Sequence, residues 1–234
     1  MKIRLSKNKK NVQLFLEEEF IGEIPIKLLP QDIYLNLNMT TQNELTQEFH
    51  TNFNTLNEES EFCDFVENWV TDNAKRKLLD YLAKAEKTIY DCKIFLNRRN
   101  IPMKIVKTIL NEFQQKKWIS DERYTSIFIE DSIIFEKSPA EIKQKLFQKK
   151  INPSIINSYL NQVYTKDKKI DTINNLIDKK IKSFQFKDKP EKNNSPQHNL
   201  FNKIATILYR KGFQYEDYCD ILTDKINKYQ KTNT

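Results

Sequence analysis

Glycine is almost absent from this chain: its 234 residues contain only two, Gly22 and Gly212. A phosphate-binding loop needs several closely spaced glycines, so the nucleotide-binding motifs built on such loops are excluded. The chain has two histidines and three cysteines, with no CxxC pair, and these leave no readable pairing of nucleophile and base. We therefore expect no catalytic residue, no cofactor and no metal, and we do not expect an enzyme.

Long apolar runs are also missing. None approaches the roughly 18 residues that a membrane-spanning helix needs, so no membrane role is expected. The first ten residues are charged and lack an apolar core, which predicts no signal peptide. Cys63, Cys92 and Cys219 stand far apart among apolar neighbours, as expected for reduced, mostly buried thiols in a cytoplasmic protein. His50 has no companion ligands and is expected at the surface.

The net charge of +7 conceals an asymmetry along the chain. Residues 1–10 carry five basic and no acidic side chains, and residues 11–72 carry one basic and 13 acidic, a balance of −12. Residues 73–234 carry 33 basic and 19 acidic side chains, a balance of +14. The basic region favours a polyanionic partner, nucleic acid first, and the alternative is an ordinary solvated surface.

The N-terminal residues 2–26 predict β structure, because apolar and polar residues alternate there. We expect a small antiparallel hairpin or a three-stranded ribbon. Such an element is marginal in water and needs a neighbour to pack on. Residues 36–60 are polar and fit either a loose helix or a flexible connector.

A helical pattern begins near Glu61 and then repeats. Residues 88–110 predict two short helices joined by a corner near Asn100–Pro102. A shift of 50 residues takes Leu96 to Leu146 and Ile101 to Ile151, and a shift of 112 residues takes them to Leu208 and Phe213. Three copies of one helical unit indicate a repeat protein, which usually binds something long.

Start and stop signals mark the helices of these units. Thr88 and Asp121 are expected N-caps, Ser138-Pro139-Ala140-Glu141 resembles a capping box, and Gly212 is expected in a left-handed C′ conformation. We expect an N-terminal hairpin and connector at 1–60 and a first repeat with a lead-in helix at 61–118. A second repeat is expected at 119–165, and a third at 166–234 with a mobile loop at 186–197. In the second repeat, one core-facing side of a helix is expected at Tyr124, Ile127, Phe128, Asp131, Ile134 and Phe135.

Four stretches of the chain resemble segments of the RecX family of recombination regulators. They are YLAKAEKTIYDCKIFLNRRNIP, WISDERYTSIFI, SPAEIKQKLFQKKI and ATILYRKGFQYEDYCDIL. Two positions depart from the family pattern: FEKSP lacks the glycine expected before the proline, and Cys92 stands where a leucine is expected.

The resemblance implies a mainly α fold of three tandem three-helix repeats in an elongated, curved array. It also implies a cytoplasmic monomer that binds the groove of the RecA–single-stranded-DNA filament and mainly inhibits its assembly, ATPase and strand exchange. RecA and single-stranded DNA are then the partners, with weak duplex binding, and the role belongs to homologous recombination, DNA repair and the SOS response.

Basic residues at helix ends and exposed positions are the candidate contacts with RecA or DNA. They are Lys75, Arg76, Arg98, Arg99, Arg123, Lys143, Lys149, Lys150, Arg210 and Lys211. For each, the alternative is compensation of a helix dipole, and Arg123 has the further alternative of an internal ion pair.

Six aromatic residues could stack on bases, although their spacing favours core packing: Tyr81, Phe95, Phe128, Phe147, Tyr159 and Phe213. A second function remains open, a helical DNA-binding protein that acts without a recombinase. The corners, however, lack a recognition helix rich in Arg, Asn and Gln.

Overall fold

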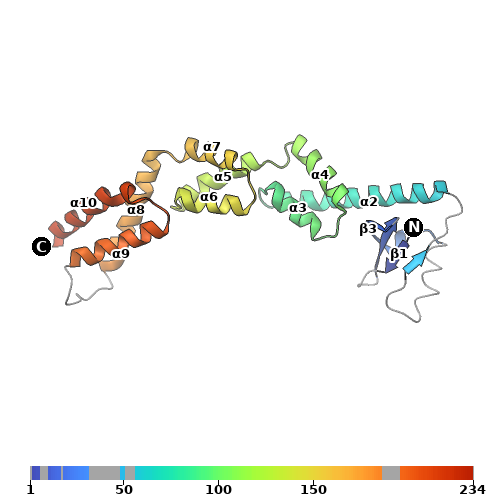
Figure 1. Ribbon diagram of the computed structural model, residues 1–234, viewed down its shortest axis with the longest axis horizontal. Coiled ribbons are helices and arrows are strands. Elements are labelled where there is room, and N and C mark those ends of the chain that lie inside the picture. The colour runs from blue at the N-terminus through green and yellow to red at the C-terminus, as the bar shows by residue number, and fades with distance from the viewer. Residues whose placement is uncertain are drawn as a thin grey trace. The chain divides into compact units, whose positions relative to one another are not determined.

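A computed structural model of the chain describes residues 2–5, 10–16, 18–31, 48–50, 56–185 and 196–233 (Figure 1). The elements in chain order are β1 (Lys2–Leu5), β2 (Asn11–Leu16), β3 (Glu19–Pro25), η1 (Ile26–Leu28), β4 (Glu48–His50), α2 (Leu56–Leu82), α3 (Ile89–Asn97), α4 (Met103–Gln115), α5 (Asp121–Ile134), α6 (Pro139–Gln148), α7 (Pro153–Val163), α8 (Lys166–Gln185), α9 (Pro196–Arg210) and α10 (Tyr215–Asn233). The expected mainly α fold with a small N-terminal sheet is confirmed.

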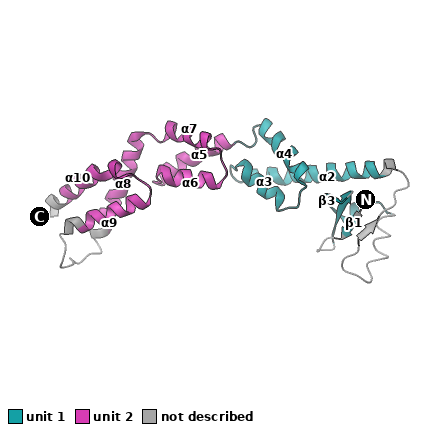
Figure 2. Ribbon diagram, viewed as in Figure 1, with its two compact units in different colours: residues 1–120 teal, residues 121–234 magenta. Residues whose placement is uncertain are grey.

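The chain forms two compact units, residues 1–120 and residues 121–234 (Figure 2). Unit 1 contains the sheet and α2–α4, and unit 2 contains α5–α10. The expected division into an N-terminal segment and three repeats stays a prediction. The expected loop 186–197 lies outside the described residues except at Pro196 and Gln197, where α9 begins.

The sheet is antiparallel and has four strands in the order β3-β2-β1-β4. Residues 2–26 form the predicted three-stranded antiparallel ribbon, β1–β3. The fourth strand, β4, pairs with β1 and comes from the polar stretch 36–60. Three residues are too few to show an alternating pattern, so this strand is specified by its partner rather than by its own sequence.

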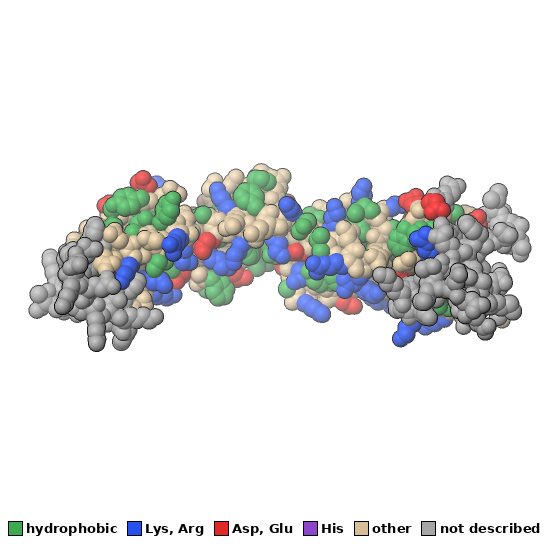
Figure 3. All heavy atoms as spheres, turned by 60° about the horizontal axis from the view of Figure 1, so that its bottom comes forward, with side chains coloured by type: hydrophobic (Ala, Val, Ile, Leu, Met, Phe, Trp, Pro, Cys, Tyr) green, Lys and Arg blue, Asp and Glu red, His purple; other side chains and the backbone are tan. Residues whose placement is uncertain are grey.

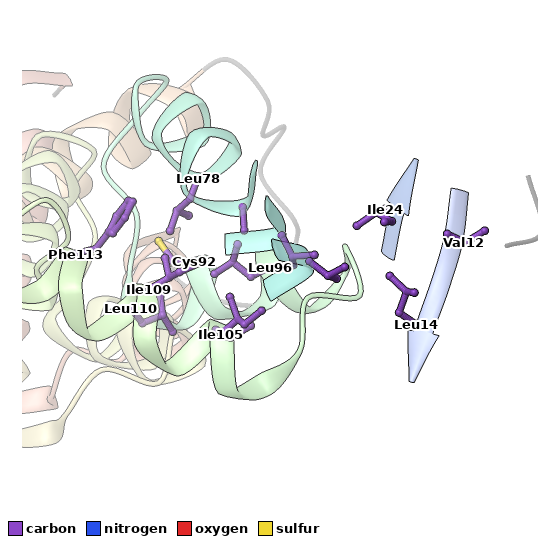
Figure 4. Packing of buried hydrophobic residues seen from close by; sticks show 14 of the residues in the cluster. Val12, Leu14, Ile24, Leu78, Cys92, Leu96, Ile105, Ile109, Leu110 and Phe113 are labelled. Carbon is purple, nitrogen blue, oxygen red and sulfur yellow. The ribbon is translucent and has the colours of Figure 1, made fainter. Parts of the chain in front are cut away.

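The sheet packs on α2, as its small size requires. Val12, Leu14 and Ile24 are fully buried and join one apolar core with residues of all three helices of unit 1 (Figure 4). Gly22 permits the close approach, because a Cβ atom there would lie 2.7 Å from Cγ2 of Val70.

Helix α2 runs without a break for 27 residues. We expected a separate lead-in helix followed by the first helix of repeat one, and that prediction was wrong. No proline or glycine occurs between Leu56 and Leu82, so nothing ends the helix between the two apolar patterns.

Unit 2 has two apolar cores, one built by α5–α7 and one by α8–α10. The expected core face of α5 was wrong, because Ile134 and Phe135 are 76% and 72% exposed. The buried residues of α5 are Thr125, Ile129 and Ser132. Two of these three carry hydroxyl groups, so an apolar pattern could not mark that face.

Most helix signals in the sequence were correct, although Asp121 is the first residue of α5 rather than its N-cap. Thr88 Oγ1 accepts a hydrogen bond of 3.0 Å from the Asp91 amide, and Ser138 with Glu141 forms the expected capping box. The thiols were predicted less well: Cys92 is buried, but Cys63 and Cys219 are only half-buried. Burial still raises the pKa of the Cys63 thiol, which keeps it protonated and slow to react.

Candidate functional site

Three helix corners share one backbone geometry. At each corner, a residue just beyond the helix donates a backbone hydrogen bond to the carbonyl five residues earlier: Ile101 to Leu96, Ile151 to Leu146, and Phe213 to Leu208. The residue immediately before each donor has a positive φ: 54° at Asn100, 60° at Lys150 and 90° at Gly212. This is the Schellman pattern of helix termination. The same bond and a positive φ also end α4, at Trp118 and Lys117, and α5, at Lys137 and Glu136. The geometry is therefore a common helix ending in this protein and is not confined to the repeated corners.

The first corner presents Arg98 and Arg99, which are both exposed. The Arg99 guanidinium stacks on Phe95, 3.5 Å from the ring centroid, and donates a hydrogen bond of 2.9 Å to the Phe95 carbonyl. Phe95 in turn stacks on Tyr81, with centroids 4.2 Å apart. The Arg99 side chain is thus held in place before any partner binds, which lowers the entropy cost of binding.

The second corner presents Lys150, which is exposed and left-handed, while Lys149 is half-buried. A lysine in this conformation costs about 1 kcal/mol relative to glycine. Phe147, two residues earlier in the chain than Lys149, is 45% exposed. Phe147 is one of the aromatic residues considered for base stacking, and it belongs to neither apolar cluster of unit 2. Phe213, at the third corner, is buried.

The third corner is docked inside unit 2. Arg210 is exposed, but Lys211 forms an ion pair with Glu141 at 3.6 Å. The Ser138 hydroxyl also donates to the Lys211 carbonyl. Gly212 lies so close to α6 that a Cβ atom there would be 2.5 Å from Cβ of Ala140. Lys211 therefore has a structural role, whatever else it touches.

The remaining candidates lie on helix surfaces. Lys75 forms an ion pair of 2.6 Å with Glu112, which Lys116 also contacts at 2.6 Å. Hydrogen bonds from Lys116 and then Lys75 hold the pKa of Glu112 below its usual value. Arg76 on α2 is exposed, and Arg123 on α5 and Lys143 on α6 are half-buried.

Figure 3 shows Lys and Arg side chains spread over one face of each unit, with hydrophobic side chains between them. The structure brings Arg98 and Arg99 together at one corner, and Lys149 and Lys150 at another. Lys75 is drawn into an internal ion pair instead.

Sequence reasoning missed Lys137 as a feature of unit 2. Its ammonium lies 5.4 Å from the ring centroid of Phe128 and 5.7 Å from that of Phe135. Burial, followed by the charge of Lys145, lowers the pKa of Lys137. Lys137 follows Glu136, a further left-handed residue with φ of 53°, and no residue type in the sequence marks that conformation.

Sequence reasoning also missed Tyr209, which is 72% exposed at the third corner. The repeat shifts of 50 and 112 residues place Tyr209 at the position equivalent to Phe147. The repeat itself could therefore have indicated Tyr209.

The described residues hold no group of three or more His, Cys, Asp or Glu side chains placed to bind a metal ion. None of the described helices combines the length and apolar character that crossing a membrane demands.

No protein-family model matches the chain. Individual relatives do match. "Regulatory protein RecX" of Streptococcus sanguinis is 26% identical over 215 residues, which is 91% of this chain and 73% of the relative. "Regulatory protein RecX" of Clostridium tetani is 30% identical over 146 residues, which is 62% of each protein. A crystal structure of regulatory protein RecX aligns with 95% of this chain and 97% of its own, with a TM-score of 0.61 and 20% identity. The chain is similar to the RecX proteins in sequence and in fold.

The RecX fold also recurs in the crystal structure of RecX from Lactobacillus salivarius, which covers 68% of this chain with a TM-score of 0.58 and 21% identity. The matched part of these relatives ranges from 50% of the Streptococcus agalactiae protein to 81% of the Streptococcus gordonii protein. These RecX relatives are named as regulatory proteins, so regulation is the class of function that the likeness supports.

Proposed function

We propose that this protein binds the RecA–single-stranded-DNA filament in its groove and limits filament assembly, ATPase activity and strand exchange. The observation that carries the proposal is that each of the three corners presents an exposed cation: Arg98 and Arg99 at the first, Lys150 at the second and Arg210 at the third. The relatives' name supports a regulatory role.

The chemistry of the corners suits DNA phosphates. Arginine offers a planar fork of donors that fits phosphate oxygens, and Arg99 is already oriented by Phe95. Contacts of this kind release counterions and carry no sequence information, so binding depends on salt and not on DNA sequence. In this proposal the protein acts as a cytoplasmic monomer.

Sedimentation of filaments tests the proposal directly. The full-length protein is mixed with RecA, single-stranded DNA and ATP, and we expect it to sediment with the filament and to lower ATP hydrolysis and strand exchange in the same concentration range. If a saturating amount leaves both activities unchanged, the proposal is wrong.

A binding assay with duplex DNA and no RecA addresses the alternative of a DNA-binding protein that acts without a recombinase. That function predicts tight, sequence-preferring binding to duplex DNA in the absence of RecA. Weak, salt-sensitive binding to duplex DNA without sequence preference would favour the filament instead.

A further inference from the structure

Unit 1 has a shallow cavity of about 330 Å³ between the β2–β3 hairpin and the corner that joins α3 to α4. Its lining is Gln13, Phe15, Phe20, Asn100 and Ile101. Two aromatic rings, one aliphatic side chain and two amides thus surround one space. The volume lies at the small end of the range for small-molecule sites.

The two phenylalanines are not explained by the core. Phe15 and Phe20 face each other across the β2–β3 pair, with ring centroids 5.4 Å apart and planes tilted by 53°. Both are half-buried, and neither belongs to the apolar cluster that Val12 and Leu14 join. Aromatic surface left at a cavity wall is available to a flat ligand.

Positive charge borders this cavity on two sides. The Arg4 guanidinium lies 5.0 Å from the ring centroid of Phe15. On the other wall, Asn100 directly follows Arg98 and Arg99, which are exposed. A ligand that places a flat ring in the cavity and anionic groups at its rim would match both features.

We propose that this cavity holds one unpaired base of single-stranded nucleic acid. The base stacks on Phe15 and Phe20, as bases do on aromatic platforms in other single-strand binders. The amides of Gln13 and Asn100 offer both donors and acceptors to the edge of the base. The Gln13 amide lies 3.5 Å from a Glu23 carboxylate oxygen, a long hydrogen bond that a base can replace.

Arg98 and Arg99 then hold the phosphates on either side of the base. In this arrangement the N-terminal sheet takes part in binding, because β2 and β3 form one wall of the site and the first helix corner forms the other. The inference rests on the proposed function for the identity of its ligand, the single strand of the filament.

The test compares binding to two labelled strands of equal length by fluorescence anisotropy. One strand is oligo(dT), and the other has the same backbone with abasic sites throughout. The wild-type protein is expected to bind oligo(dT) about tenfold more tightly, the value of one stacked base. The variant Phe15→Leu/Phe20→Leu should bind both strands with the weaker affinity.

Phe65→Leu is the matched control, because Phe65 is an exposed phenylalanine of α2 in the same unit and does not line the cavity. It should retain the preference for bases. Asn100→Gly is a second variant that keeps the left-handed backbone, since glycine adopts positive φ freely. It should lose part of the preference while the fold stays intact.

Equal binding of the two strands by the wild-type protein would overturn the inference, and so would a preference that survives in Phe15→Leu/Phe20→Leu. Either result would mean that the cavity binds something other than a base, such as a peptide of the partner protein. A base preference without any effect on RecA ATPase would contradict the proposed function alone. Inhibition of RecA without a base preference would contradict this inference alone.

Discussion

The Ser138 side chain, at the start of α6, donates a hydrogen bond to the backbone carbonyl of Lys211 at the corner between α9 and α10. The same oxygen accepts from the Glu141 amide at 3.1 Å and so caps α6. One fully buried hydroxyl therefore serves both a helix start and the junction between two helical cores of unit 2.

Replacing Ser138 with alanine should remove both bonds and leave the Lys211 carbonyl without this partner. We expect a loss of about 2–3 kcal/mol in the free energy of unfolding, measured by urea denaturation. Thr88→Ala is the matched control, because buried Thr88 caps α3 through the Asp91 amide and should cost about 1 kcal/mol. Equal losses in the two variants would contradict the second role of Ser138.

Gly212→Ala should be strongly destabilising, by about 2–4 kcal/mol. The new Cβ atom would lie 2.5 Å from Cβ of Ala140, and φ of 90° disfavours any side chain. Adding Ala140→Gly removes the clash but not the backbone strain, so we expect partial recovery in a double-mutant cycle. Full recovery would mean that the strain at this corner is negligible.

Lys150→Gly separates stability from binding. Glycine fits φ of 60° without strain, so we expect the free energy of unfolding to rise by about 0.5–1 kcal/mol. The loss of an exposed cation should at the same time weaken binding to the RecA–DNA filament. Calorimetry and filament sedimentation measure the two effects, and unchanged sedimentation would remove Lys150 from the proposed interface.

Arg98→Ala/Arg99→Ala should weaken filament binding and flatten its salt dependence, by about one unit of slope for each phosphate that the variant no longer neutralises. Lys77→Ala/Lys107→Ala is the control, since it removes two exposed positive charges from unit 1 away from the corner. A similar change in both double variants would indicate a general effect of net charge.

Glu112 should contribute to the acid sensitivity of unit 1. Because the Lys116 and Lys75 hydrogen bonds lower its pKa in the folded state, its stabilising effect is full above the unfolded pKa and is lost as the pH falls through the folded one. Glu112→Gln should therefore be less stable at neutral pH, and its stability should change less on acidification. A parallel pH profile for the two proteins would exclude this contribution.

The sequence was informative wherever local chemistry decides the structure. Thr88, the Ser138–Glu141 pair and Gly212 were predicted correctly, because caps and left-handed residues depend on neighbours in the chain. The helix content and the three corners followed from apolar spacing for the same reason.

The rest depends on residues that are distant in sequence. The strand β4 pairs through its backbone with β1, and α5 buries Thr125 and Ser132, which no apolar pattern could reveal. At the candidate site, no local pattern indicates that Lys75 and Lys211 pair with Glu112 and Glu141. Nor does any pattern show that Phe15 and Phe20 meet Asn100 at one cavity.

The single apolar core of unit 1, which extends from Ile3 to Ile119, bears on how the protein is made. The strands leave the ribosome first, yet their buried face is covered only when α2 has followed, and that helix in turn requires α3 and α4. At typical rates of synthesis, the nascent sheet waits on the order of ten seconds for its partners. During that time its apolar residues are exposed to chaperones, so the yield of this protein in cells should depend on them.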